Sequence, residues 1–164
     1  MSKRLIQISF GTCISLYMLL VCFNNITDYG SNFQFVSMVS GMDDVASKAN
    51  TGWRSVHGDV PHHLIYLGII TVEIVIAMLS LFGTVQMTRR FRSDILEFES
   101  ARKWLVAGLA LGVVLWFGLF IGVGGEWFLM WQSESWNGQQ TAFFLTITFL
   151  LFLVYLSKTE AADT

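Results

Sequence analysis

WRSVHGDVPHHLIYLGIITVE, residues Trp53–Glu73, is the stretch in which a polar loop becomes a long apolar segment. It contains all three histidines of the chain and its only proline, and it places a carboxylate, Glu73, inside the apolar part. Proline suits the first turn of a helix, where its missing N–H has no intrahelical partner, so Val60-Pro61 marks a helix start. The stretch therefore predicts a transmembrane helix that carries polar groups into the bilayer.

The composition of the whole chain also indicates a membrane protein. Of its 164 residues, 54% are hydrophobic and only 13% are charged, whereas soluble domains carry about 25% charged residues. The mean hydropathy is +0.57. The net charge is −2 and there is no basic patch, which argues against a nucleic-acid partner. The expected partner is the lipid bilayer.

Four apolar segments are long enough to cross a hydrocarbon core of ~30 Å at ~1.5 Å per residue. They are expected at residues 5–23, 64–86, 104–123 and 140–156. The first is longer than the apolar part of a signal peptide and lacks a small-residue cleavage site, so we expect it to be retained. The sequence therefore predicts an all-α membrane protein. It would be a four-transmembrane-helix bundle in one domain, residues 1–164, with an ordered outer-side loop between the first two helices.

Lysine and arginine are distributed unequally between the two sides of this bundle. Eight of the ten lie in the N-terminus, the C-terminus or the loop between the second and third spans, whereas Lys48 and Arg54 lie in the long loop between the first two spans. Cytoplasmic loops are enriched in Lys and Arg. Both termini are therefore expected in the cytoplasm, and the long loop is expected outside.

One face of the second span is polar. At ~100° per residue, His62, Tyr66, Glu73, Ser80 and Thr84 fall within a narrow arc. Glu73 lies ~16 Å deeper than His62 and therefore close to the middle of the bilayer. A charged carboxylate costs at least ~2.5–3.5 kcal/mol there. Such groups usually face the interior of a bundle, and we expect the same of this polar stripe.

Glu73 has no obvious charged partner, because none of the four spans contains a lysine or arginine. It must therefore carry a proton or be compensated by something outside the chain. The candidate neutral partners are hydroxyl residues of the first and fourth spans: Ser9, Thr12, Ser15, Thr146 and Thr148. Two interpretations stay open: a carboxylate that accepts a proton or ligand, and a protonated glutamate that joins helices by hydrogen bonds.

The histidines do not form an evident metal or haem site. His62 and His63 are adjacent, so their side chains point ~100° apart on a helix and suit one metal poorly. No other span contains a histidine that could supply a second haem ligand. We expect hydrogen-bonding histidines at the membrane interface, with no metal and no cofactor. Contact with a quinone, a proton or a partner stays open.

The outer loops contain several polar candidates. Asp28 lies in the turn-rich run NNITDYG, and residues 31–39 are expected to form a short helix at the interface. The pair Asp43-Asp44 reads as a solvated acidic turn rather than a calcium site.

Aromatic residues mark the outer ends of spans three and four. We expect Trp53 and Arg54 to pack against the tryptophans in this region, and we hypothesise an ion pair between Arg54 and Glu126.

The third span carries four glycines, Gly108, Gly112, Gly118 and Gly122. At ~100° per residue they share an arc of ~120°. A stripe of glycines allows helix backbones to approach closely in lipid. The stripe predicts packing within the chain, and a homo-oligomer or another membrane protein as the neighbour is the alternative.

Three segments are specific enough to suggest a relationship. NNITDYGSNFQFV, the WRS…HHLIY…E stretch and GGEWFLMWQSESWNGQQTAF resemble a family of small bacterial inner-membrane proteins known only as a domain of unknown function. The resemblance covers about Leu5 to Tyr155. It implies an integral protein of the bacterial inner membrane with four transmembrane helices. It implies no activity, so no catalytic residue can be assigned from it.

The functional expectation follows from what the residues offer. The sequence contains no G-x-S-x-G, H-E-x-x-H or phosphate-binding loop, so we do not expect an enzyme. The favoured hypothesis is a non-enzymatic accessory or scaffold subunit of a membrane complex. The alternative is a small protein that translocates protons or a ligand along the His62–Tyr66–Glu73 stripe.

Overall fold

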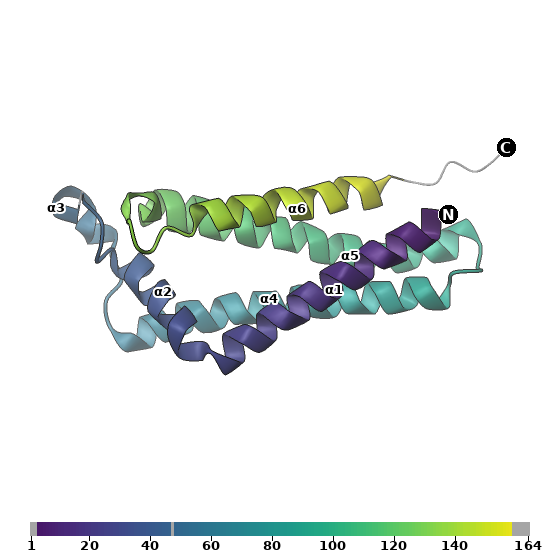
Figure 1. Cartoon of the computed structure of the whole chain (residues 1–164), viewed down its shortest axis with the longest axis horizontal. Coiled ribbons are helices and arrows are strands. Elements are labelled where there is room, and N and C mark those ends of the chain that lie inside the picture. The colour runs from purple at the N-terminus through teal and green to yellow at the C-terminus, as the bar shows by residue number, and fades with distance from the viewer. Residues whose placement is uncertain (1–2, 47, 159–164) are drawn as a thin grey trace.

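A computed structural model describes residues 3–46 and 48–158, and within them the chain is helical (Figure 1). The longer helices are α1 (Lys3–Thr27), α2 (Tyr29–Gly41), α4 (Asp59–Arg89), α5 (Ile95–Val113) and α6 (Gln139–Ser157). The shorter ones are α3 (Lys48–Thr51), η1 (Gly52–Arg54) and η3 (Met130–Gln132), while η2 (Val114–Trp127) continues α5 as a π-helix. The described residues include four helices long and apolar enough to span a membrane. The predicted four-helix membrane bundle is confirmed.

The helices continue beyond the apolar spans expected from the sequence. The first runs to Thr27 and the second begins at Asp59, because a helix keeps satisfying its backbone hydrogen bonds after it leaves the hydrocarbon region. One consequence concerns Asn24 and Asn25. We expected them in a turn, and they lie in the last turns of α1. The short helix expected at residues 31–39 is confirmed as α2.

The third span also begins earlier than expected. Asp94 accepts a hydrogen bond from the backbone N of Glu97 at 2.8 Å and so caps α5, which starts at Ile95. Arg102, which we expected in a loop, therefore lies on the helix. Its side chain is buried and donates to the backbone O of Lys158 and to Glu99 Oε1, each at 3.2 Å. The bond to Lys158 fastens the end of α6 to α5, while the bond to Glu99 lies within α5.

The four long helices, α1, α4, α5 with η2, and α6, run along the length of one bundle (Figure 1). The α4 helix packs against α1 on one side and α5 on the other, and α6 packs against α5 and η2. The Phe10 ring contacts Phe152 and Tyr155, with centroids 4.9 and 5.3 Å away, and so joins α1 to α6. The shorter α2 lies against α4.

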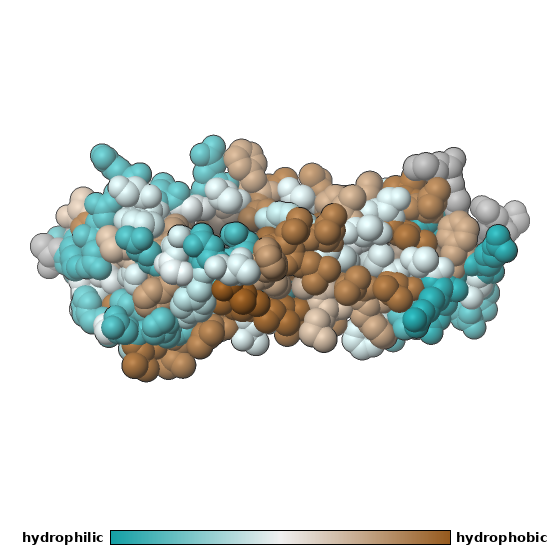
Figure 2. Space-filling model, turned by 60° about the horizontal axis from the view of Figure 1, so that its bottom comes forward, coloured by the Kyte–Doolittle hydropathy of each residue, from teal (hydrophilic) through white to brown (hydrophobic). Residues whose placement is uncertain are grey.

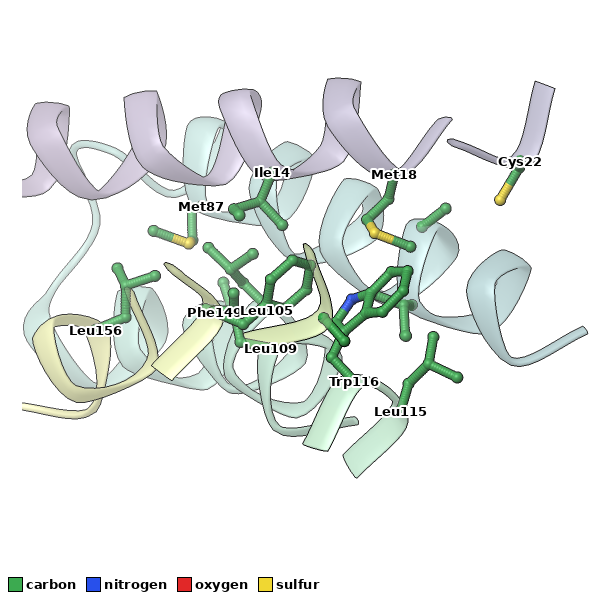
Figure 3. Packing of buried hydrophobic residues seen from close by; sticks show 14 of the residues in the cluster. Ile14, Met18, Cys22, Met87, Leu105, Leu109, Leu115, Trp116, Phe149 and Leu156 are labelled. Carbon is green, nitrogen blue, oxygen red and sulfur yellow. The ribbon is translucent and has the colours of Figure 1, made fainter. Parts of the chain in front are cut away.

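Side chains from all four long helices meet in one hydrophobic core (Figure 3). Its fully buried members include Met18, Ile76, Leu105, Leu109 and Phe149. A smaller buried cluster joins α2 to α4. Many other apolar side chains are exposed, and Figure 2 shows a hydrophobic region between two hydrophilic ends. An apolar exterior is what lipid requires, and the four helices satisfy their backbone groups internally.

The two ends of the bundle differ in charge and in structure. At one end lie Lys3, Lys158 and the turn between α4 and α5, where Arg4 Nη1 donates to the backbone O of Ser93 at 2.7 Å (Figure 1). We call this the basic end, because eight of the ten Lys and Arg residues belong to its segments. The opposite end, formed by α2, α3, η1 and η3, is called the capped end.

Candidate functional site

All five residues of the predicted polar stripe are buried inside the bundle. The exposed fractions are 9% for His62, 2% for Tyr66, 1% for Glu73, 0% for Ser80 and 6% for Thr84. The helical phase therefore placed these side chains correctly on the face of α4 that contacts other helices. Glu73 lies about midway along α4, roughly 21 Å from Asp59 along the helix axis.

The hydrogen-bond partner of Glu73 is Asn25. The Asn25 side-chain Nδ2 donates to Glu73 Oε2 at 2.5 Å. About two turns nearer the capped end, the Tyr66 hydroxyl donates to the backbone O of Asn25 at 3.0 Å. Two residues of α4 thus hold one residue of α1 through different groups. This clamp fixes the carboxamide of Asn25 against the carboxyl group.

The hydroxyl residues proposed as partners of Glu73 bond elsewhere. Ser9 and Thr12 are exposed, and their hydroxyls donate to carbonyls of their own helix. Ser15 lies within 3.3 Å of the Thr84 hydroxyl, nearer the basic end. Thr146 and Thr148 donate to backbone oxygens within α6. These expectations fail because a helical hydroxyl residue can satisfy its donor on the preceding turn.

A cavity of about 270 Å³ opens beside the clamp. Its polar lining comes from Asn25, Asn32, Tyr66, Glu73 and Thr141. The aromatic lining adds Phe35, Trp116 and Phe120 to the ring of Tyr66. Among the described residues, none that lines the cavity is a lysine, arginine or histidine. The carboxyl group therefore meets a polar, aromatic space that offers it no cationic side chain.

Trp116 contributes an additional polar group to this region. Trp116 is only 8% exposed, and its indole Nε1 has no hydrogen-bond partner among the residues that the structure describes. Buried donors are nearly always paired in proteins. Trp116 therefore brings an unpaired donor to a residue that lines the cavity.

The three histidines bond to neighbours at the capped end. His57 Nε2 lies 2.8 Å from Ser55 Oγ, and His62 Nε2 lies 2.9 Å from the backbone O of Val56. His63 Nδ1 lies 2.8 Å from the Tyr29 hydroxyl, and its ring stacks on Phe33 with centroids 4.1 Å apart. The histidines thus orient the loop and α2 over the start of α4.

Other candidate residues form the outer surface of the capped end. The Arg54 guanidinium lies over the rings of Trp53 and Trp127, 5.4 and 5.5 Å from their centroids. It forms no ion pair with Glu126 within the described part of the chain. Two indole faces replace the expected carboxylate, because cation–π contact also stabilises a guanidinium. Asp28 is exposed and accepts from Ser31 Oγ at 2.9 Å.

Asp43 and Asp44, the acidic pair of the long loop, both bond to side chains of the protein. Asp43 pairs with Lys48 at 2.8 Å, and Asp44 accepts a hydrogen bond from Ser133 Oγ at 2.7 Å. Ser133 Oγ also accepts from the backbone N of Trp136 at 2.8 Å. The long loop is thereby bonded to the segment between η2 and α6, which gives the capped end its order.

The four glycines of the third span divide into two pairs. Beside Gly108 lie the α4 residues Ser80 and Leu79, and beside Gly112 lies the ring of Phe149 on α6. Gly118 and Gly122 have only atoms of their own helix near the position of a Cβ. The difference arises at Val114, where π-helical bonding changes the angle between successive residues, so a ~100° count no longer applies.

Sequence reasoning did not single out Asn25, Trp116 or Thr141 as site residues. Asn25 and Glu73 are 48 residues apart, and Trp116 reads as one more aromatic in an apolar span. The one available signal was Asn25 itself, a carboxamide at the outer end of an apolar segment whose helix could continue. The cavity exists only because α1, α2, α4, η2 and α6 converge there.

This architecture defines a class: a small integral membrane protein with four transmembrane helices and a carboxyl-containing cavity in one half of the bundle. The chain belongs to the family described as "Predicted small integral membrane protein (DUF2165)", which matches residues 3–159. A search of curated proteins and a search of solved structures each found no match. The expected membership in a family of small membrane proteins is confirmed, and the family description names no activity.

Proposed function

We propose that the protein is a non-enzymatic membrane protein that binds a proton or a small cation at Glu73. The observation that carries the proposal is a carboxyl group, 1% exposed, that lines a cavity without a basic side chain among the residues described there. A purely structural glutamate needs only its hydrogen-bond partner. A cavity beside it provides room for something that exchanges.

Electrostatics limits what that cavity can hold. An ionised carboxylate in hydrocarbon is costly unless a positive charge accompanies it. Asn25 donates one hydrogen bond to Glu73 but brings no charge. A proton on the carboxyl group or a cation in the cavity supplies the missing charge. The two would compete for the same oxygen atoms, so binding of a cation should release the proton.

The aromatic lining supports a cation in particular. Trp116, Phe120, Phe35 and Tyr66 surround the space next to Glu73. The faces of aromatic rings attract ammonium groups, and the attraction is largest where water is excluded. An anion would meet the carboxyl group and no compensating positive side chain. The lining therefore favours ammonium-type ligands over phosphates or carboxylates.

Infrared difference spectroscopy of the purified protein tests this proposal. A pH change should alter a carboxyl C=O band in the wild type, and addition of tetramethylammonium should reproduce the deprotonated spectrum. Glu73→Gln should lose one C=O band from the pH-difference spectrum and the whole response to tetramethylammonium, whereas Glu126→Gln, at an exposed position, should keep both. If the wild type and Glu73→Gln give the same pH-difference spectrum, Glu73 does not exchange a proton and the proposal is wrong.

The proposal includes an orientation in the bacterial inner membrane. The excess of Lys and Arg at the basic end supports cytoplasmic termini, which places the cavity in the outer half. Single cysteines test it in a chain with Cys13 and Cys22 replaced. A membrane-impermeant maleimide added to intact cells should label Ser135→Cys, at the capped end, and not Ser93→Cys, in the α4–α5 turn. The reverse pattern would invert the orientation.

A second candidate function is an accessory subunit of a larger membrane complex. It is favoured by the aromatic surface of the capped end, where Trp53, Trp127 and Trp131 are 72%, 47% and 49% exposed. Tryptophans are enriched in protein interfaces as well as at the membrane surface. Purification from native membranes in a mild detergent tests it. A defined partner or a homo-oligomer supports this role, and a monomer without a partner contradicts it.

A further inference from the structure

An apolar groove adjoins the cavity that contains Glu73. Its volume is about 340 Å³, and it is formed by α2, α4, η2 and η3. Apart from Ser40 and two glycines, its lining consists of apolar side chains, such as Leu64, Val72, Leu119 and Val123. It lies toward the capped end, as the polar cavity does. This groove therefore suits a hydrocarbon chain.

The groove and the cavity share part of their walls. Phe35, Val36, Ile69 and Phe120 line both. The polar space and the apolar space are therefore adjacent. Ligand pockets usually measure ~300–1,000 Å³, and the two adjacent spaces together fall within that range. A polar group at Glu73 and an attached chain in the groove match this division.

On this basis we infer that the ligand is a single-chain amphiphilic amine, with its ammonium group at Glu73 and its hydrocarbon chain in the groove. The inference rests on the proposed function and names its ligand class. The carboxyl group and aromatic rings select the ammonium group. The apolar lining selects an amine with a long hydrocarbon chain, because it offers the methylene groups apolar contacts. A phospholipid head is disfavoured, because its phosphate finds no basic side chain among the described cavity residues.

The groove also offers a position at which a substitution can block the hydrocarbon chain of the ligand. A Cβ added at Gly68 has nothing within 4 Å, although Gly68 lines the groove. Gly68→Leu therefore adds apolar volume at the wall of the groove, beginning from a Cβ without a close neighbour, and it leaves Glu73 and Asn25 unchanged. Glu73→Gln changes the polar end alone. The two variants separate recognition of the chain from recognition of the head.

Equilibrium dialysis tests the inference with labelled probes and protein in lipid nanodiscs, with empty nanodiscs to correct for partitioning. The probes are decylammonium, the uncharged decanol, the anionic decanoate and the short methylammonium. Decylammonium should bind at least tenfold more tightly than any of the other three. Glu73→Gln should abolish this preference for the amine. Gly68→Leu should weaken decylammonium at least tenfold and leave methylammonium unchanged.

The outcomes distinguish this inference from the proposed function. If methylammonium binds as well as decylammonium and both depend on Glu73, the groove takes no part and the inference is overturned, while the proposed function stands. If decanol binds as tightly as decylammonium in the wild type and in Glu73→Gln, the groove holds a lipid tail only, which overturns the inference. If no amine binding depends on Glu73, both proposals fail. Monodisperse elution and unchanged helicity verify that each variant folds.

Discussion

The substitution Gly83→Ala tests a close approach of two helix backbones, those of α4 and α5. A Cβ at position 83 would meet the backbone N of Leu105, with the Cα and Cβ of that residue at 3.0 Å. Non-bonded carbon atoms prefer ~3.5–4.0 Å. Because the obstacle is backbone, a change of side-chain rotamer cannot relieve it. The two helices must separate by roughly 0.5–1 Å.

The expected cost follows from that separation. A gap of ~0.5–1 Å forfeits a quarter to a half of the contact energy of each affected atom pair. Overpacking of this kind typically costs ~1–3 kcal/mol. Alanine is also a better helix former than glycine by ~0.5–1 kcal/mol. This gain opposes the packing cost, so a single variant does not isolate either effect.

Gly68→Ala supplies the matched control. It makes the same chemical change in the same helix, and the added Cβ has nothing within 4 Å. The gain in helix propensity is common to both variants, so their difference measures the packing cost. We expect Gly83→Ala to be less stable than Gly68→Ala by ~1–3 kcal/mol. For a chain of this length, each kcal/mol lowers the melting temperature by ~2–4 °C.

Reversible unfolding in mixed detergent micelles, with an increasing fraction of dodecyl sulfate, provides the assay, and thermal melting followed by circular dichroism provides a second one. Tm and the unfolding midpoint should both fall for Gly83→Ala relative to Gly68→Ala. Equal midpoints, or a more stable Gly83→Ala, would refute the reasoning. Either result would mean that α4 and α5 do not approach as closely as the structure shows.

Three further substitutions probe other parts of the molecule. Tyr66→Phe removes the hydrogen bond to the backbone O of Asn25 and should lower the free energy of unfolding by ~0.5–1.5 kcal/mol; an unchanged value in the micelle assay contradicts the clamp. Gln7→Met should raise stability by ~1 kcal/mol in the same assay, because Gln7 is fully buried and neither amide atom has a partner among the described residues. Ser133→Ala should speed hydrogen exchange in η3 through loss of the bond to Asp44, with global stability within ~0.5 kcal/mol of wild type; unchanged exchange argues against an ordered capped end.

The buried stripe on α4 was predictable because helix geometry is fixed. Once apolar length had identified the span, a constant angle per residue placed Tyr66 and Glu73 on one face. The cost of exposing a carboxyl group to lipid then pointed that face inward. The same reasoning failed for Gly118 and Gly122, because η2 is π-helical and the constant angle does not hold there.

The interaction partners of individual side chains were much less predictable than the helix face on which each side chain lies. Asn25 was expected in a turn, yet the continuation of α1 brings it to Glu73. Arg54 was expected to pair with Glu126, yet it stacks on Trp53 and Trp127. The predicted packing of Arg54 against tryptophans is confirmed, and only the ion pair is wrong. Charge and residue type do not specify which of several suitable groups lies within ~3 Å, because that depends on where helices end and how they cross.

The sequence alone determined the class of this protein, its four spans and the inward face of α4. Each of these depends on a local quantity: apolar length against the thickness of a bilayer and rotation per residue within one helix. Only the tertiary structure decided that Glu73 bonds to Asn25 and lines a cavity with Trp116 beside an apolar groove. Those features depend on the convergence of segments distant in sequence, and the space left between them is set by packing rather than by any single segment.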